Sequence, residues 1–156
     1  NLNIQRVNIK ELIYTAAEIA LPKIEEKQIE LKVAVDVEAL EIEADKELII
    51  HVFANLIANA FKYTSSGGIV EVKVFKDAKG VVVEVKDTGI GIPPEDTPHI
   101  FEEFFRAGNV LKTTKGTGLG LALAKYIIER HGGNIFLESE LGKGTTFRFT
   151  IPKKEK

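Results

Sequence analysis

Two asparagines four residues apart, Asn55 and Asn59, are followed one helical turn later by Lys62 and Tyr63. Residues at this spacing share one face of an α-helix. An amide oxygen is a neutral hard ligand for a Mg²⁺ ion that already carries phosphates. A lysine can meet phosphate oxygens as a point charge, and a tyrosine ring can cover a flat base. The pattern predicts a nucleotide site, although ordinary surface amides would explain either asparagine alone.

An apolar stripe marks the helix that must carry these polar groups. Its members recur at helical spacing, and such a stripe normally faces a core. They are Leu48, Ile49, Val52, Phe53, Leu56, Ile57 and Ala60. Because Asp45 precedes the stripe as an N-cap, we expect a helix from this point, with both amides along one edge of its buried face.

Asp87 ends a valine-rich run, 81–86, that predicts a strand. A carboxylate at a strand end can accept a hydrogen bond from an exocyclic amine. Adenine carries that donor at N6, where guanine carries an acceptor. Gly89 and Gly91 follow and would let a ligand approach the backbone closely. Taken alone, this segment is better explained as an ordinary turn.

Two more glycine segments lie downstream. Gly116, Gly118 and Gly120 lead into a helix expected over 119–130, and glycines before a helix N-terminus can form a phosphate site. A flexible loop explains them about equally well. The other segment, 142–144, separates two alternating runs and alone would be only a hairpin turn.

In this combination and order, the chain resembles the ATP-binding catalytic domain of sensor histidine kinases, in the superfamily shared with DNA gyrase B, the Hsp90 chaperone and MutL. The resemblance covers essentially the whole chain. Five segments carry it: Asn55–Thr64, Asp87–Gly91, Phe101–Arg106, Gly116–Gly120 and Gly142–Thr145. Each is weak alone, and their joint occurrence in this order is specific.

The resemblance implies roles for individual side chains. Asn59 corresponds to the Mg²⁺ ligand, Lys62 to a phosphate contact, and Tyr63 to the residue that packs on adenine. Asp87 corresponds to the adenine N6 acceptor. Thr145 corresponds to the hydroxyl that reaches adenine, usually through water, and the neighbouring Thr146 leaves a one-residue alternative.

The resemblance also implies a mobile lid over the nucleotide, between Arg106 and Lys115. Arg106 could meet the γ-phosphate or form a surface ion pair, and both remain open. Phe101 and its two neighbouring phenylalanines are core candidates, yet we expect at least one to stay exposed as an interaction patch. The remaining nucleotide contacts expected around the lid are Gly89, Gly91, Lys115, Gly116, Thr117, Gly118, Leu119 and Gly120.

Asn55 distinguishes a kinase from a hydrolase. In the gyrase-like ATPases, a glutamate four residues before the magnesium asparagine orients the attacking water. An amide at this position is a poor general base, so the site should hold ATP for an external nucleophile. We expect the catalytic residues to be Asn55, Lys62 and Arg106.

That nucleophile is missing from the chain. His51, His99 and His131 all lack the following acidic residue and nearby proline of the family's phosphoacceptor, so we expect them to be structural or surface residues. The resemblance implies a histidine-bearing dimerisation hairpin on a separate domain, an upstream sensor domain and a response regulator as partners. It also implies a cytoplasmic domain that is homodimeric only in the full-length protein.

The composition fits one excised globular domain over residues 1–156. The chain is 44% hydrophobic and 28% charged, with no cysteine and a net charge of −2, so disulfides are excluded and nothing suggests nucleic-acid binding. No apolar run approaches the roughly 18 residues of a membrane span.

Helices and strands interleave, and two consecutive hairpins exclude a purely parallel sheet. We expect an α/β (α+β) two-layer sandwich, with a mixed sheet of about five strands and three main helices on one face. The first helix should start at the Asn8 cap, run to about Ile24 and bend at Pro22. The expected strands are 30–35, a short strand near Ile42, 69–76, 81–87, 134–139 and 145–151.

Three functions remain open. The leading one is the ATP-binding half of a two-component kinase, which transfers the γ-phosphate of Mg-ATP to histidine for relay to a regulator aspartate. The second is an anti-sigma-type serine kinase of the same fold, which the Phe101–Arg106 segment disfavours. The third is a non-catalytic nucleotide-sensing docking module, against which the intact Asn59, Lys62 and Asp87 argue.

Overall fold

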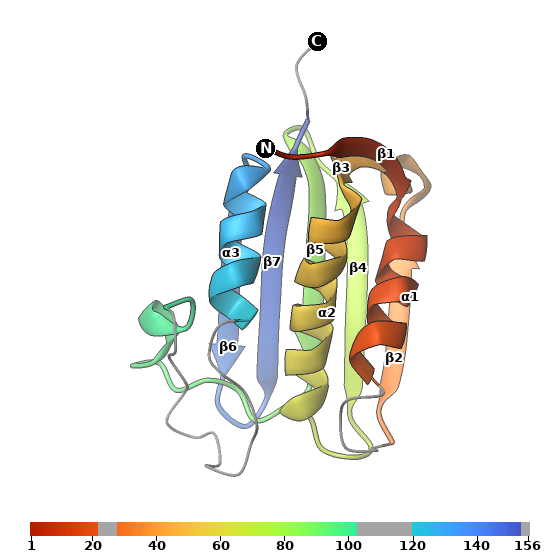
Figure 1. The fold of residues 1–156 in the computed structure, drawn as a ribbon. Coiled ribbons are helices and arrows are strands. Elements are labelled where there is room, and N and C mark those ends of the chain that lie inside the picture. The colour runs from red at the N-terminus through yellow and green to blue at the C-terminus, as the bar shows by residue number, and fades with distance from the viewer. Residues whose placement is uncertain (22–27, 103–119, 154–156) are drawn as a thin grey trace.

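The computed structural model describes residues 1–21, 28–102 and 120–153, which form a two-layer sandwich (Figure 1). One layer is a five-stranded sheet in the order β2-β4-β5-β7-β6. Its strands are β2 Glu30–Val35, β4 Ile69–Lys76, β5 Gly80–Asp87, β6 Ile135–Glu140 and β7 Gly144–Pro152. β2 and β4 are parallel, and all other neighbours are antiparallel. The predicted mixed sheet is confirmed.

The second layer consists of helices that cover one face of this sheet (Figure 1). Among the described residues there are three α-helices: α1 Ile9–Ala20, α2 Lys46–Lys62 and α3 Gly120–Arg130. The core lies between the layers, where Phe53 of α2 meets Phe149 of β7 with ring centroids 5.7 Å apart. The apolar stripe predicted for α2 faces this core, and most of its side chains are fully buried.

Both predicted helix caps are present. The Asn8 side chain accepts a hydrogen bond from the Glu11 amide at 3.1 Å, and Asp45 accepts one from the Leu48 amide at 3.3 Å. The first helix was expected to continue and bend, but α1 ends at Ala20. Pro22 itself lies outside the described residues. A proline cannot donate to the helical ladder, so the helix ends before it.

A small second sheet was only half predicted. β3 (Glu41–Asp45) is the expected strand near Ile42, but it pairs antiparallel with β1 (Ile4–Asn8), for which the sequence carries no clear signal. The Asn3 amide, just before β1, also donates to Asp45 Oδ2 at 2.9 Å. Asp45 therefore caps α2 with one oxygen and holds the first residues of the chain with the other.

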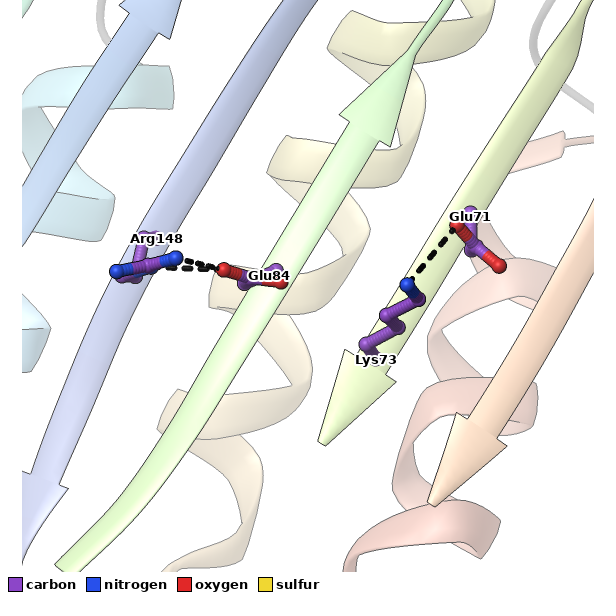
Figure 2. Close-up of polar contacts among 4 residues, drawn as sticks. All are labelled: Glu71, Lys73, Glu84 and Arg148. Atoms are coloured by element: carbon purple, nitrogen blue, oxygen red, sulfur yellow. Dashed lines mark hydrogen bonds and ion pairs between the residues drawn. The ribbon is translucent and has the colours of Figure 1, made fainter. Parts of the chain in front are cut away.

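The sheet face turned away from the helices is lined with charges of alternating sign. Lys73 of β4 lies opposite Glu84 of β5, which lies opposite Arg148 of β7. Figure 2 shows Arg148 donating to Glu84, with the Nε to Oε2 distance at 2.8 Å, and Lys73 near Glu71 at 3.8 Å. Because opposite charges face each other across the strands, this face is suited to water.

The described part of the stretch after residue 93 contains one short helical turn, η3, at Thr97–His99. It leads to Ile100 and Phe101, which pack with Ile92 in a small satellite of the core. Phe101 is half-buried and meets the Phe147 ring edge-on at a centroid distance of 6.0 Å. The two phenylalanines that follow it lie outside the described residues, so an exposed patch there stays a prediction.

Candidate functional site

The C-terminal half of α2 carries the predicted polar edge. Asn55, Asn59 and Lys62 are each half-buried, whereas Val52 and Leu56 on the adjoining stripe are fully buried. Tyr63, which is also half-buried, forms the C-cap and donates its amide to the Asn59 carbonyl at 3.3 Å. The core thus fixes the rotation of α2 and places the two amides and the cation along one edge of its buried face.

Asp87 ends the central strand β5 directly opposite Thr145 of β7. Its side chain is only 5% exposed. Oδ1 accepts hydrogen bonds from the amides of Gly89 at 2.8 Å and Thr145 at 3.2 Å. Both hydrogen bonds that the described residues donate to this carboxylate end on Oδ1 and not on Oδ2. Oδ2 therefore has the capacity to accept a donor from a ligand.

Burial raises the pKa of the Asp87 carboxyl above its ordinary value, and the two backbone hydrogen bonds oppose this rise. The cause is the loss of water around the charged form. A ligand that donates a hydrogen bond to Oδ2 would replace part of the solvation that the ionised carboxylate loses on burial. The site is therefore built to favour a hydrogen-bond donor at this oxygen.

The register of β7 resolves which threonine accompanies Asp87. Thr145 is 6% exposed and shares the inner face with Asp87. Thr146 points to the opposite face, where it lines a shallow hollow with Phe136 and Arg148. Successive side chains of a strand alternate between faces, so only Thr145 can act with Asp87.

Gly89 and Gly91 have a packing reason that sequence analysis did not find. A Cβ on Gly89 would collide with the Tyr63 carbonyl at the end of α2, and one on Gly91 would collide with the Glu140 carbonyl. Gly91 also has φ +75°, which favours glycine. The Ile90 amide donates to the Tyr63 carbonyl at 3.1 Å. These glycines therefore seat the loop after β5 against α2 and β6, beside Asp87.

Asn55 connects α2 to the start of α3. Its Nδ2 donates to the Gly120 carbonyl at 3.3 Å, and a Cβ on Gly120 would lie 3.4 Å from Asn55 Oδ1. Gly120 therefore packs against Asn55, and the phosphate contacts predicted for the glycine run stay a prediction. The other residues predicted in the lid region lie outside the described residues: Arg106, Lys115, Gly116, Thr117, Gly118 and Leu119.

Ser139 on β6, which no motif of the sequence indicated, contacts Thr145. Its Oγ lies 2.8 Å from Thr145 Oγ1, 3.1 Å from the Gly144 carbonyl and 2.7 Å from the Ile92 amide. Ser139 is paired with Thr145 in the strand register. The only signal was the alternation that places position 139 on the inner face of a predicted hairpin.

The three histidines make structural or surface contacts, as expected. His51 is exposed, and exposed His99 has its Nδ1 2.8 Å from a Glu102 carboxylate oxygen. His131 lies with Nδ1 2.9 Å from the Ile127 carbonyl, and its Nε2 accepts from the Asp45 amide at 3.0 Å. His131 therefore holds the end of α3 against the start of α2.

Comparison with known proteins places the chain in a well-populated group. Residues 44–155 match the family model described as histidine kinase-, DNA gyrase B-, and HSP90-like ATPase. The chain is 42% identical over 136 residues to Drug sensory protein A of Synechocystis, covering 81% of this chain and 20% of that protein. It is 44% identical over 120 residues to Sensor histidine kinase WalK of Bacillus subtilis, covering 74% of this chain and 20% of that protein.

Solved structures agree with this assignment. The catalytic domain of histidine kinase ThkA superposes with a TM-score of 0.82 at 35% identity, covering 99% of this chain and 100% of that one. ThkA in complex with the response regulator protein TrrA superposes with a TM-score of 0.77 at 32% identity, covering 97% and 42%. The chain spans about a fifth of the length of the two sequence relatives named above. Within the described residues, no helix is long and apolar enough to cross a membrane.

Proposed function

Because this chain belongs to the family of histidine kinase-, DNA gyrase B- and HSP90-like ATPases, we propose that it binds Mg-ATP and transfers the γ-phosphate to a histidine on a separate domain. The phosphoryl group then passes to an aspartate of a response regulator. The sensor-kinase names of its relatives favour histidine over serine as the acceptor, and a kinase over a docking module.

The main support for this proposal is a buried pair of residues, Asp87 at the end of β5 and Thr145 opposite it on β7. A carboxylate with one oxygen bound to two backbone amides, and the other without a hydrogen bond from the described residues, can accept a donor in a fixed direction. The N6 amine of adenine is such a donor, and guanine presents an acceptor at that position. Tyr63, whose carbonyl receives the Ile90 amide of the adjoining loop, would pack on the base.

The polar edge of α2 provides the phosphate end of the site. Asn59 would hold Mg²⁺ through its amide oxygen, and Lys62, one turn further, would meet phosphate oxygens. Mg²⁺ takes few protein ligands when phosphates complete its shell, and one neutral oxygen fits this requirement. When bound, the ion neutralises charge on the phosphates during transfer. The polar edge itself aligns the phosphate chain.

Asn55 supports transfer to an external acceptor rather than to water. Its amide cannot take a proton from water as a carboxylate can. Its Nδ2 is also engaged with the Gly120 carbonyl, so this side chain joins α2 to α3 beside the phosphate end. Catalysis would then come from positioning and charge, with the acceptor histidine brought from outside.

The partners follow from the same proposal. A histidine-bearing dimerisation hairpin would supply the nucleophile, and a homodimer would form through that hairpin. The ThkA complex with TrrA supports a response regulator as the next acceptor. An upstream sensor domain would set the activity, and use of ATP places this domain on the cytoplasmic side. Arg106 and the lid segment 106–115 remain predicted γ-phosphate and lid contacts.

Calorimetric titration of the chain with ATP and GTP, each with and without Mg²⁺, tests the site. We expect ATP to bind, Mg²⁺ to strengthen binding, and GTP to bind weakly. Asp87→Asn should weaken ATP, whereas Asp77→Asn should not. Asp77 is the matched control because its carboxylate also accepts two backbone amides, those of Lys79 and Gly80, at the far end of β5. Failure to bind ATP under every condition would refute the proposal.

Transfer is tested separately with labelled ATP and the purified histidine-bearing hairpin of a related sensor kinase. We expect an acid-labile, alkali-stable label on the hairpin that disappears when its histidine is replaced. ATP binding without any transfer to such hairpins would contradict the assigned acceptor and leave the nucleotide site intact. Label on serine would instead establish the anti-sigma-type alternative.

A further inference from the structure

We propose that His131 is a positioning residue of the nucleotide site: its hydrogen bond with the Asp45 amide sets how α3 lies against α2 at Asn55, and it does so only while the ring is neutral. This inference rests on the proposed function, because Asn55 lies at the phosphate end of the proposed ATP site. His131 itself lies just beyond the other end of α3.

A hydrogen bond joins α3 to α2 at each end of α3. At the start of α3, Asn55 Nδ2 donates to the Gly120 carbonyl at 3.3 Å. Just after its last residue, His131 Nε2 accepts from the amide of Asp45, the N-cap of α2, at 3.0 Å. The two helices are neighbours in the helical layer (Figure 1). Their relative position is therefore set by two polar connections, one beside the proposed site and one far from it.

The far connection requires one protonation state of the imidazole. A backbone amide can only donate, so the Asp45 amide needs a lone pair on His131 Nε2. The other ring nitrogen, Nδ1, lies 2.9 Å from the Ile127 carbonyl, which can only accept, so Nδ1 carries the proton. The contact thus needs the neutral ring. Histidine is the side chain whose ordinary charge change falls between about pH 5 and 8.

A second proton on the ring would remove the contact with the Asp45 amide. Nε2–H and the amide N–H would then be two donors facing each other at 3.0 Å. The ring must therefore leave the amide, which loses its acceptor although Asp45 is only 8% exposed. Because an unpaired N–H at a buried position is costly, the two helix ends would no longer favour their present spacing.

Electrostatic attraction at this junction changes the pH of the transition and not its outcome. The pKa of Asp45 is lowered mainly by the hydrogen bond from the Asn3 amide, and a protonated His131 lowers it further. The Asp45 carboxylate thus favours the charged ring, but a ring that turns toward this carboxylate has still left the amide. The other charged residues beside the junction are exposed: Lys46, Glu47, Glu129 and Arg130.

A change at one end of α3 reaches the other because the helix is short and moves as one body. Its 11 residues span about 16 Å. Its buried side chains, Ala124, Ile127 and Ile128, lie between the two ends, so the helix can tilt about them. The hydrogen bond between Asn55 and Gly120 is 3.3 Å long, near the upper limit for an N–H to O contact, and a small tilt would break it.

The alternative is that His131 only stabilises the fold and has no effect on the site. Two variants separate these roles. His131→Gln keeps an acceptor that can reach the Asp45 amide and does not titrate, whereas His131→Leu has no acceptor at any pH. A purely stabilising residue would leave the Asn55 side chain unmoved in the folded protein.

The first measurement follows the side-chain amide signals of Asn55 by NMR in the nucleotide-free chain, from about pH 8 to about pH 5. We expect these signals to move with the titration of His131 in the unchanged chain. They should stay near the neutral position in His131→Gln and near the acid position in His131→Leu. His51→Gln is the matched control, because exposed His51 lies four residues before Asn55 on α2 and titrates in the same range. The response should persist in that control.

The second measurement is the ATP dissociation constant by calorimetry at both ends of this pH range. ATP also gains a proton in acid, so the unchanged chain is compared with His131→Gln at the same pH. The ratio of their dissociation constants should be near one at about pH 8. It should rise to about five at about pH 5, the usual effect of one lost hydrogen bond. In an Asn55→Ala background the ratio should stay near one, because His131 acts through Asn55.

Asn55 signals that titrate equally in His131→Gln, or that do not move at all, would overturn the proposal. Equal ATP affinities of the unchanged chain and His131→Gln in acid would also overturn it. If His131→Leu does not fold, the unchanged chain and His131→Gln still decide the question. If the Asn55 signals respond as expected but ATP does not bind at any pH, the proposed function fails instead, so the two failures are distinguishable.

Discussion

Replacing Asp87 by asparagine should make the protein more stable and less able to bind ATP. Asparagine keeps an oxygen that can accept the Gly89 and Thr145 amides, so the main change is loss of a buried charge. Burial raises the pKa of this carboxyl, which means that the folded protein holds its ionised form at a cost. At neutral pH, removing the charge should stabilise the nucleotide-free domain by about 0.5–2 kcal/mol, the usual size of the gain from a single stabilising substitution.

The loss of ATP affinity follows from the other carboxylate oxygen, Oδ2, which the substitution removes. A hydrogen bond to a charged group contributes about 1.5–3 kcal/mol, so Asp87→Asn should weaken ATP roughly 10- to 150-fold. The amide can also turn its NH₂ toward the ligand, where it would face another donor. GTP, which carries an acceptor at that position, should lose less.

The pH dependence of the unfolding free energy tests whether the buried charge of Asp87 is the cause. Because the folded pKa is raised, the folded state binds more protons than the unfolded state as pH rises above the unfolded value of 3.8. The contribution of Asp87 to stability is thus fully present below that value and is lost as pH rises through the folded pKa. The gain in unfolding free energy from Asp87→Asn should be smallest in acid and largest at neutral pH.

Thermal and urea unfolding of both proteins from pH 3.5 to 7.5, without nucleotide, provide the measurement. A gain that is constant with pH would show that the charge is not responsible. A less stable variant at neutral pH would refute the reasoning, since the hydrogen bonds to the ionised form would then outweigh its burial.

Three other changes have defined outcomes. Gly89→Ala should lower the free energy of unfolding by about 1–3 kcal/mol, because its Cβ meets the Tyr63 carbonyl, and unchanged urea unfolding would contradict that packing. Asn55→Glu should raise phosphate release from ATP by at least about tenfold by supplying a base, with Asn55→Ala as the control that must stay slow. Glu84→Gln should cost only about 0.5 kcal/mol through its contact with Arg148, and a loss that persists in 1 M salt would argue against an electrostatic origin.

The central strands and α2 could be predicted because local pattern and tertiary burial agree there. β4 has the predicted bounds, and β5 starts one residue earlier, at Gly80. The turn between them uses Asp77, whose carboxylate binds the amides of Lys79 and Gly80. Where alternation and turn chemistry point the same way, a sequence identifies its strands.

Elements stabilised only by distant partners were harder to predict. β1 buries a single side chain, that of Val7, and owes its strand conformation to pairing with β3. His131 contacts the Asp45 amide across 86 residues of sequence, which no local pattern encodes. The same limit applies to Ser139, since its contact with Thr145 depends on which residue faces it on the next strand.

Part of the site followed directly from helical periodicity. Asn55, Asn59 and Lys62 occupy the predicted edge of α2 because the stripe beside them must be buried. The choice between Thr145 and Thr146 needed the register of β7, because one residue of shift exchanges the two faces of a strand. Their roles toward ATP remain predictions.

The row from Asp87 through Thr145 to Ser139 also bears on how the domain folds. The Ser139–Thr145 pair forms within a local hairpin, but Asp87 and Thr145 are 58 residues apart in sequence, so their pairing must close a long loop that contains α3. Such non-local pairing forms slowly. A β7 strand slipped by one residue could still pair with β5, yet it would turn Thr145 to the wrong face. A nucleotide that needs both side chains would therefore bind only the correctly registered chain and draw the folding equilibrium toward it by mass action.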